Sequence, residues 1–233
     1  MIQTARMFSL RPACWLFATA MPLALNAHAA TSTYRYDTVH SQVVFSVDHD
    51  GYSRPFGRLH IARGWLRFDP DDWSTAATEL DIDLAGVDMG DAAWNAAVRE
   101  PALLDSAHRR YAHFASTGVE RSDAHHGVLH GQLTLRGITR AVELPFTFNR
   151  AALTVFGMHY VAGFSATATL DRTDFGMAAH PGSIGQQVVL WLQVEAIRDD
   201  RAGPAPAGSA HPSSPATQDA GISRREVRHA AAR

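Results

Sequence analysis

Hydrophobic and polar residues alternate with a period of two along much of this 233-residue chain. In residues 37–51 the apolar side chains of Val43, Phe45 and Val47 alternate with a mixed set, and the stretch ends in polar residues and a glycine. A period of two places successive side chains on opposite faces of a strand, and a polar run with glycine is typical of a turn. We therefore predict the first long strand here.

The same alternation recurs along the chain and predicts seven further strands. Gly64 stands where the alternation changes phase, which predicts a bulge or a sharp bend, and Pro145 predicts irregular pairing. A short extended piece at residues 34–36 precedes the first long strand. The seven further strands are predicted at residues 57–69, 79–87, 113–120, 127–135, 141–149, 161–170 and 187–197.

Residues 91–104 form the one stretch that favours a helix. Asp91 can cap its start, an alanine-rich sequence follows, and Pro101 interrupts it. The strands follow one another at short spacing without alternating helices, which predicts an all-β antiparallel barrel or sandwich. A barrel of eight strands can enclose one small ligand, and we expect the helix to plug one end.

The two ends of the chain differ in composition from its middle. Residues 1–29 combine Arg6 and Arg11, an apolar centre and an Ala27-His28-Ala29 cleavage pattern, which predicts a cleaved signal peptide and a periplasmic protein. The apolar run is shorter than the roughly 20 residues of a membrane-spanning helix. Residues 199–233 are rich in Gly, Pro, Ala and Ser, which predicts a disordered tail. The barrel domain is then residues 30–198.

Charge and cysteine content exclude several classes of function. The formal net charge is −2 and the pI is about 6.7, so neither nucleic acid nor an anionic membrane is indicated by overall charge. The single cysteine, Cys14, lies in the predicted signal peptide, so we expect no disulfide in the mature chain. Four arginines of the tail offer contacts to lipid headgroups or a partner, although a solvated tail is the simpler interpretation: Arg224, Arg225, Arg228 and Arg233.

Three groups of residues suggest chemistry, and for each we favour a structural interpretation. Glu79, Asp81 and Asp83 share one face of a predicted strand, where a solvated outer face is typical of antiparallel sheets. The histidines of a predicted hairpin turn lack a diagnostic metal-ligand spacing, and we predict no metal. They are His125, His126 and His130.

A catalytic site can be drawn from His40, Ser41 and His49 with nearby carboxylates such as Asp37. It lacks an evident device for stabilising an oxyanion, so we predict no catalytic residues. The common hydrolase, phosphate-loop, dinucleotide and metalloprotease motifs do not occur in the sequence.

An ordered series of short motifs resembles the YceI-like, or polyisoprenoid-binding, family over about residues 34–197. The resemblance implies a lipocalin-like eight-stranded antiparallel barrel with a short helix at one end, exported to the periplasm. The motifs are D-x-x-H-S-x-V-x-F-x-V-x-H at 37–49, the glycines at 57 and 64, F-D-P at 68–70, L-x-I-x-L at 80–84 with V-D-M-G at 87–90, G-x-L-T-L-x-G-x-T at 131–139, D-R-x-D-F-G at 171–176 and V-x-L-x-x-x-V-E at 188–195.

The resemblance further implies a non-catalytic carrier whose lumen holds an isoprenoid or similar amphiphilic chain, such as a polyisoprenoid or an isoprenoid quinone, with no cofactor. The chain departs from the family at Ala97-Val98, where members often carry His-Leu, and at Leu103-Leu104-Asp105, which suggests a more apolar cavity mouth. One face of the strands supplies the candidate lining: Phe45, Val47, Leu59, Ile61, Leu80, Ile82, Phe114, Leu144, Phe146, Phe164, Leu190 and Leu192.

A charged or polar head should stay at the wet rim of an apolar tunnel, because unpaired charge is costly inside it. Arg172 is the candidate cation for an oxyanion there, and the alternative is that it only fixes its own loop. Two other classes of function stay open: a packed structural or partner-binding barrel that supports a membrane redox or stress-response system, and an enzyme acting on a small amphiphile. Transient membrane contact and a homodimer also stay open.

Overall fold

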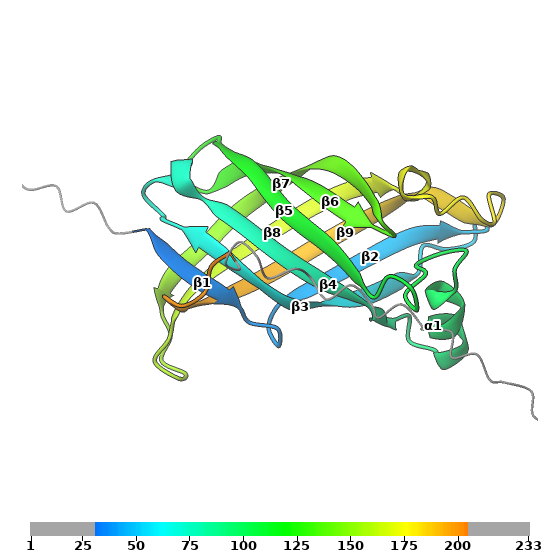
Figure 1. Cartoon of the computed structure of the whole chain (residues 1–233), viewed down its shortest axis with the longest axis horizontal. Helices are drawn as coiled ribbons and strands as arrows, with labels where there is room; N and C mark the ends of the chain where they lie inside the picture. The colour runs from blue at the N-terminus through cyan, green and yellow to red at the C-terminus, as the bar shows by residue number, and fades with distance from the viewer. Residues whose placement is uncertain (1–30, 205–233) are drawn as a thin grey trace, which may run out of the picture. The chain divides into compact units, whose positions relative to one another are not determined.

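Antiparallel strands make up most of residues 31–204, which are the residues that the computed structural model describes (Figure 1). The predicted signal peptide and nearly all of the predicted tail lie outside the described residues. The strands are β1 Ser32–Tyr36, β2 Gln42–His49, β3 Phe56–Phe68, β4 Ala77–Asp88, β5 Tyr111–Arg121, β6 His126–Leu135, β7 Ile138–Leu153, β8 Tyr160–Asp171 and β9 Ile184–Arg198. The helices are α1 Ala92–Arg99 and two short 3₁₀ turns, η1 Trp73–Thr75 and η2 Arg172–Phe175.

The sheet closes on itself as a barrel with eight strand positions. Strands β3, β2, β9, β8, β7, β6, β5 and β4 are neighbours in that order, and β4 pairs with β3 to complete the ring. Strand β1 pairs with the same two neighbours as β2, namely β3 and β9, so β1 and β2 together occupy one position. The predicted eight-stranded antiparallel barrel is confirmed.

The break between β1 and β2 is bridged by Ser41, whose side chain is buried. Its hydroxyl donates to the carbonyl of Glu195 at 3.0 Å and lies 3.1 Å from the amide of the same residue. The amide of Asp37 donates to that carbonyl at 2.9 Å. Ser41 thus replaces the backbone hydrogen bonds that the broken strand cannot make with β9.

The predicted irregularity in β3 is present, two residues before Gly64. Ile61 pairs with Ile82 and Arg63 with Asp81, so Ala62 is the extra residue of a β-bulge. A Cβ atom on Gly64 would lie 2.5 Å from the carbonyl oxygen of Glu79, too close for any side chain. Glycine is needed here because β4 approaches the backbone directly.

Pro145 marks the end of one ladder, as its sequence predicts. The pairing of β7 with β8 runs from Leu153 and Tyr160 to Phe146 and Ala166, and Pro145 is the next residue on β7. Proline has no amide hydrogen to donate, which agrees with the end of the pairing with β8 at this residue. On its other side β7 pairs with β6 from Ile138 to Thr147, and Pro145 lies within that pairing opposite Val128.

The acidic face of β4 lies outside the barrel, but the prediction that all three carboxylates are solvated is wrong for Asp81. This side chain is buried beneath Arg63, at 2.5 Å, and beneath the His113 ring, at 2.8 Å. Long side chains from β3 and β5 therefore cover it and supply the hydrogen bonds that a buried carboxylate requires. Asp83 pairs with Arg110 at 3.0 Å, and this pairing helps to hold the pKa of Asp83 below its usual value although burial alone would raise it.

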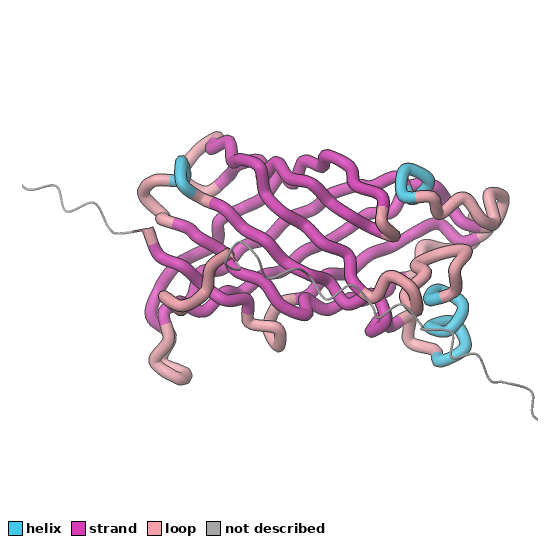
Figure 2. The backbone as a smooth tube through the Cα atoms, viewed as in Figure 1, coloured by secondary structure: helices cyan, strands magenta, loops and turns pink. Residues whose placement is uncertain are grey.

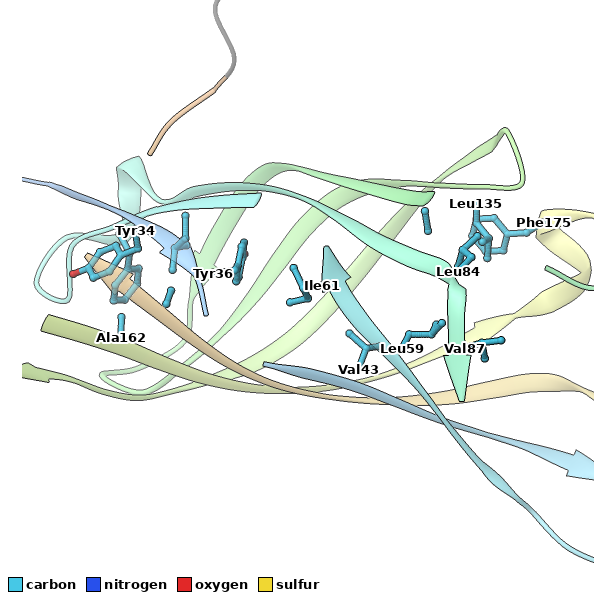
Figure 3. Packing of buried hydrophobic residues seen from close by; sticks show 14 of the residues in the cluster. Tyr34, Tyr36, Val43, Leu59, Ile61, Leu84, Val87, Leu135, Ala162 and Phe175 are labelled. Atoms are coloured by element: carbon cyan, nitrogen blue, oxygen red, sulfur yellow. The ribbon is translucent and has the colours of Figure 1, made fainter. Parts of the chain in front are cut away.

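The two ends of the barrel are closed differently. Helix α1, capped by the Asp91 side chain as predicted, lies at one end (Figures 1 and 2). At the other end the ring of Phe68 lies 5.0 Å from the rings of both Phe148 and Phe164, and Trp73 stacks on Phe146 at 5.3 Å. Figure 3 follows the buried residues along the axis, from Tyr34 and Tyr36 near the aromatic end to Leu135 and Phe175 near the helical end. Aromatic rings thus pack one end solid.

Candidate functional site

A cavity of about 500 Å³ fills the helical half of the barrel. Its wall combines inward side chains of β2, β3, β4 and β9 with Trp94, Ala97 and Val98 of α1 and with the loop that follows η2. The wall is overwhelmingly apolar, because each strand turns the same alternate face toward the axis. A concave apolar space of this size is within the range of small-molecule binding sites.

A second cavity of about 150 Å³ continues toward the aromatic end. The two cavities share five wall residues, which form the junction between them: Val43, Ile82, Leu133, Leu170 and Leu190. The two adjoining cavities together form the apolar interior of the barrel, which we call the lumen, and it ends at the aromatic cluster of Phe68, Phe146 and Phe164. A lumen of this form suits an extended hydrocarbon chain better than a compact ligand.

The structure brings almost all the candidate lining residues to this lumen. Ile61 is the exception, since it is buried in the wall and borders neither cavity. The outer cavity is lined by Phe45, Val47, Leu59, Ile82, Leu190 and Arg172. The deeper cavity is lined by Leu80, Ile82, Phe114, Leu144, Phe146, Phe164, Leu190 and Leu192. Contact of these residues with a ligand stays a prediction.

Several lining residues were not among the sequence candidates. Val43 and Val188 have the same parity as candidates on their strands, and Leu133 follows the alternation of β6, a strand that supplied no candidate, so the alternation could have identified all three. The segment between β8 and the start of β9 supplies three more lining residues, Phe175, Met177 and Ile184. Apolar and polar residues do not alternate in this segment, so the sequence pattern could not identify them. Only the tertiary structure brings that loop over the mouth. The helix residues Ala97 and Val98 border the cavity, so the positions that depart from the family pattern face the ligand space.

Polar groups gather only at the helical end of the outer cavity. Asp48, His49 and Asp50 come from the end of β2 and its turn, and His180 and Ser183 come from the loop before β9. The ring of His49 lies edge-on to Trp94 at 5.7 Å. This arrangement gives the lumen one polar mouth and one closed apolar end.

Arg172 lies at this mouth, but its guanidinium is engaged by the backbone. The residue is 3% exposed, and its Nε and Nη2 donate to the carbonyls of Gly185 and Ile184 at 2.9 and 2.8 Å. Its Nη1 donates to the carbonyl of Met177. Burial lowers the pKa of Arg172, and the Asp171 carboxylate opposes this shift. These contacts favour the loop-fixing role of Arg172 over a headgroup role.

We expect the substitution Arg172→Gln to lower the free energy of unfolding by about 2–3 kcal/mol, because buried carbonyls lose their donor. Binding of a prenyl pyrophosphate and of the matching prenyl alcohol should weaken to the same degree. Thermal unfolding and parallel titrations measure both effects. Unchanged stability with a selective loss of pyrophosphate binding would instead assign Arg172 to the headgroup.

The residues of the conceivable catalytic site are not assembled around the lumen. His40 is exposed, its Nδ1 lies 2.9 Å from an Asp37 carboxylate oxygen, and it borders neither cavity. Burial alone would raise the pKa of Asp37, but hydrogen bonds from His40 and Val39 lower it. The Ser41 hydroxyl is held by the backbone of β9, and of the three residues only His49 borders a cavity.

The hairpin histidines have separate partners rather than a common centre. His126 contacts Asp123 at 2.9 Å, His125 contacts the carbonyl of Phe148 at 3.0 Å, and His130 lies 3.3 Å from Glu120. Within residues 31–204 no three His, Cys, Asp or Glu side chains converge as metal ligands would.

Fold and cavity together define the class of this molecule, an eight-stranded antiparallel barrel around an elongated apolar cavity. A sequence model of the YceI-like domain matches residues 34–196, which is most of the chain. The chain therefore belongs to the YceI-like family.

Known relatives agree in sequence and in fold. A UPF0312 protein of Serratia proteamaculans is 31% identical over 183 residues, which are 77% of this chain and 94% of the relative. Burkholderia cenocepacia BcnA superposes with a TM-score of 0.61 at 19% identity, over 69% of this chain and 99% of the other. A polyisoprenoid-binding domain from Saccharophagus degradans superposes with a TM-score of 0.53 at 14% identity, over 71% and 98%. At such identities these structures establish the fold alone.

Proposed function

We propose that the protein is a non-catalytic periplasmic carrier for an isoprenoid or similar amphiphilic lipid. The observation that carries this proposal is the pair of adjoining apolar cavities along the barrel, with polar groups beside α1 and aromatic rings at the other end. The resemblance of the fold to a domain described as polyisoprenoid-binding supports it.

The energetics of such binding require no dedicated chemistry. Each buried methylene contributes roughly 0.8 kcal/mol, so a long chain gains affinity from its length alone. The aromatic cluster fills one end only, and the open volume beyond it argues against a barrel packed throughout. The engagement of Ser41 with the β9 backbone and the position of His40 away from the lumen support a role without catalysis.

The mouth favours a lipid whose polar head is uncharged. Two carboxylates, Asp48 and Asp50, border it, and Arg172 is the one arginine among the described residues that line this cavity. Because the Arg172 donors are occupied by carbonyls, a pyrophosphate would meet two carboxylates with no arginine of the cavity wall free to pair with it. An alcohol or a quinone ring avoids this repulsion.

Lipid extraction and mass spectrometry of protein purified from a periplasmic extract test the carrier proposal. We expect a co-purified amphiphile with a long hydrocarbon chain. Protein that is empty and that also takes up no added prenyl chain would refute the proposal. No helix in residues 31–204 is long and apolar enough to cross a membrane.

A matched pair of ligands tests the nature of the head. We expect a prenyl alcohol to bind at least ten-fold more tightly than the pyrophosphate of the same chain length. The double substitution Asp48→Asn with Asp50→Asn should narrow this difference, mostly by improving pyrophosphate binding. Equal binding of both ligands to the unaltered protein would contradict the headgroup assignment while leaving the carrier function intact.

A further inference from the structure

The hairpin that joins β7 to β8 carries an apolar tip that the barrel leaves uncovered. Leu153, Val155, Phe156 and Met158 are 56, 81, 86 and 69% exposed. Residues 150–160 contain no acidic side chain. Turns are usually built from polar residues, and a group of exposed large apolar side chains marks an interaction site. We call residues 153–158 the apolar finger.

Two hydrogen bonds define the backbone of the finger. The amide of Thr154 donates to the carbonyl of His159 at 2.7 Å, and the Thr154 hydroxyl accepts from the amide of Phe156 at 3.3 Å. Gly157 and Met158 have φ angles of +79° and +54°, which turn the chain back into β8. Each backbone group that is paired within the turn lowers the cost of placing the turn in an apolar environment.

The shape of the finger favours a fluid partner over a rigid one. It projects beyond the strands as the yellow-green loop at the lower left of Figure 1, and the same loop is pink in Figure 2. A convex tip cannot cover its side chains against its own barrel. The tip gathers one aromatic ring, one methionine and two aliphatic side chains. Such a group resembles the apolar faces of membrane-surface proteins, which enter the boundary between lipid headgroups and acyl chains.

The segment that follows β9 contains more basic than acidic residues, so its charge is opposite to that of anionic lipids. Ile197 near the end of β9 pairs with Val161, next to the base of the finger, and the described chain ends shortly afterwards at Pro204. Residues 205–233 contain two acidic residues, Asp219 and Glu226, against four basic ones: Arg224, Arg225, Arg228 and Arg233. A basic segment that continues from the same end of a membrane-contacting barrel can attract anionic lipids.

We propose that the apolar finger inserts into the surface of a lipid bilayer that contains anionic lipids, with the basic C-terminal segment strengthening the attachment. The aromatic end of the barrel then faces the bilayer and the polar mouth beside α1 faces away from it. This proposal does not depend on which ligand fills the lumen.

Co-sedimentation with vesicles tests the proposal on the full mature chain. The vesicles contain phosphatidylethanolamine and phosphatidylglycerol, and a second set contains phosphatidylcholine alone. We expect binding to the anionic set, and we expect Phe156→Asp combined with Val155→Asp to reduce it at least ten-fold. Val39→Asp is the matched control, because Val39 is 78% exposed on the loop between β1 and β2.

The outcomes of this experiment distinguish a lipid bilayer from other binding partners of the finger. No binding of the unaltered protein to anionic vesicles overturns the proposal, and so does an equal loss in the Val39→Asp control. A dimer seen by light scattering that the finger substitutions dissociate, without vesicle binding, would assign the finger to a second copy instead. Circular dichroism shows whether the variants remain folded. The single substitution Phe156→Ser removes the apolar ring without adding a charge, so a loss of binding in this folded variant reflects the loss of the ring.

Replacing the four tail arginines with glutamine provides an independent readout. We expect these substitutions to remove the preference for anionic over neutral vesicles while the finger still binds weakly to both. A preference that persists unchanged would overturn the role of the C-terminal segment.

Discussion

Substitution of Ala166 by tryptophan is expected to weaken the binding of a long polyprenyl alcohol by about 100-fold. Ala166 lines the deeper cavity, where an indole would occupy the space that the end of the chain needs. Excluding three or four carbons at roughly 0.8 kcal/mol each removes about 2.5–3 kcal/mol of binding free energy. A short ligand such as geraniol should bind nearly as before, because the outer cavity of about 500 Å³ accommodates it.

Thr167→Trp is the matched control for this prediction. Thr167 is the next residue on β8 and is exposed on the outer face of the barrel, so the same side chain there leaves the lumen unchanged. Fluorescence displacement titrations with both alcohols measure the dissociation constants. If Ala166→Trp weakened both ligands equally, or neither, the ligand chain would not extend from the mouth into the deeper cavity.

Removal of the Phe68 side chain is expected to lower the free energy of unfolding by about 3–5 kcal/mol. Phe68 is 2% exposed and contacts the aromatic rings of Trp73, Phe148 and Phe164. Phe68→Ala would leave a cavity in the one part of the barrel that is packed solid, and each neighbouring ring would lose a partner. Chemical denaturation measures the change.

The same strand supplies the control for this substitution. Phe56 lies at the opposite end of β3, is 64% exposed and contacts one aromatic ring among residues 31–204, that of Trp191, at a centroid distance of 5.7 Å. Phe56→Ala should cost less than about 1 kcal/mol, as surface changes usually do. Equal effects at the two positions would mean that the aromatic cluster does not stabilise the barrel more than a surface contact does.

These two predictions concern different properties of one lumen. The aromatic end stabilises the barrel because its rings pack closely against one another. The helical end is suited to binding because its side chains leave a cavity. Phe68→Ala opens a void beside the deeper cavity, so it should also let a long chain extend further. A longer preferred chain in the destabilised variant would link the stability of the closed end to the length of the ligand.

The local pattern of the sequence determined the strands, the cap of α1 at Asp91 and the faces that line the lumen. These features depend on near neighbours: the pleat alternates side chains, and a cap bonds an amide three residues away. Pro145 and Gly64 were informative for the same reason, because each limits what its own backbone can do. The resemblance to the YceI-like family rested on such short motifs in order.

Other features were decided only by contacts between residues distant in the sequence. The burial of Asp81 depends on Arg63 and His113 from two other strands, and the engagement of Arg172 depends on carbonyls at 177, 184 and 185. The space left in the lumen is the difference between the volume that the barrel encloses and the volume that its inward side chains fill. That difference is set by strand tilt, register and bulges together, and no stretch of sequence specifies it alone.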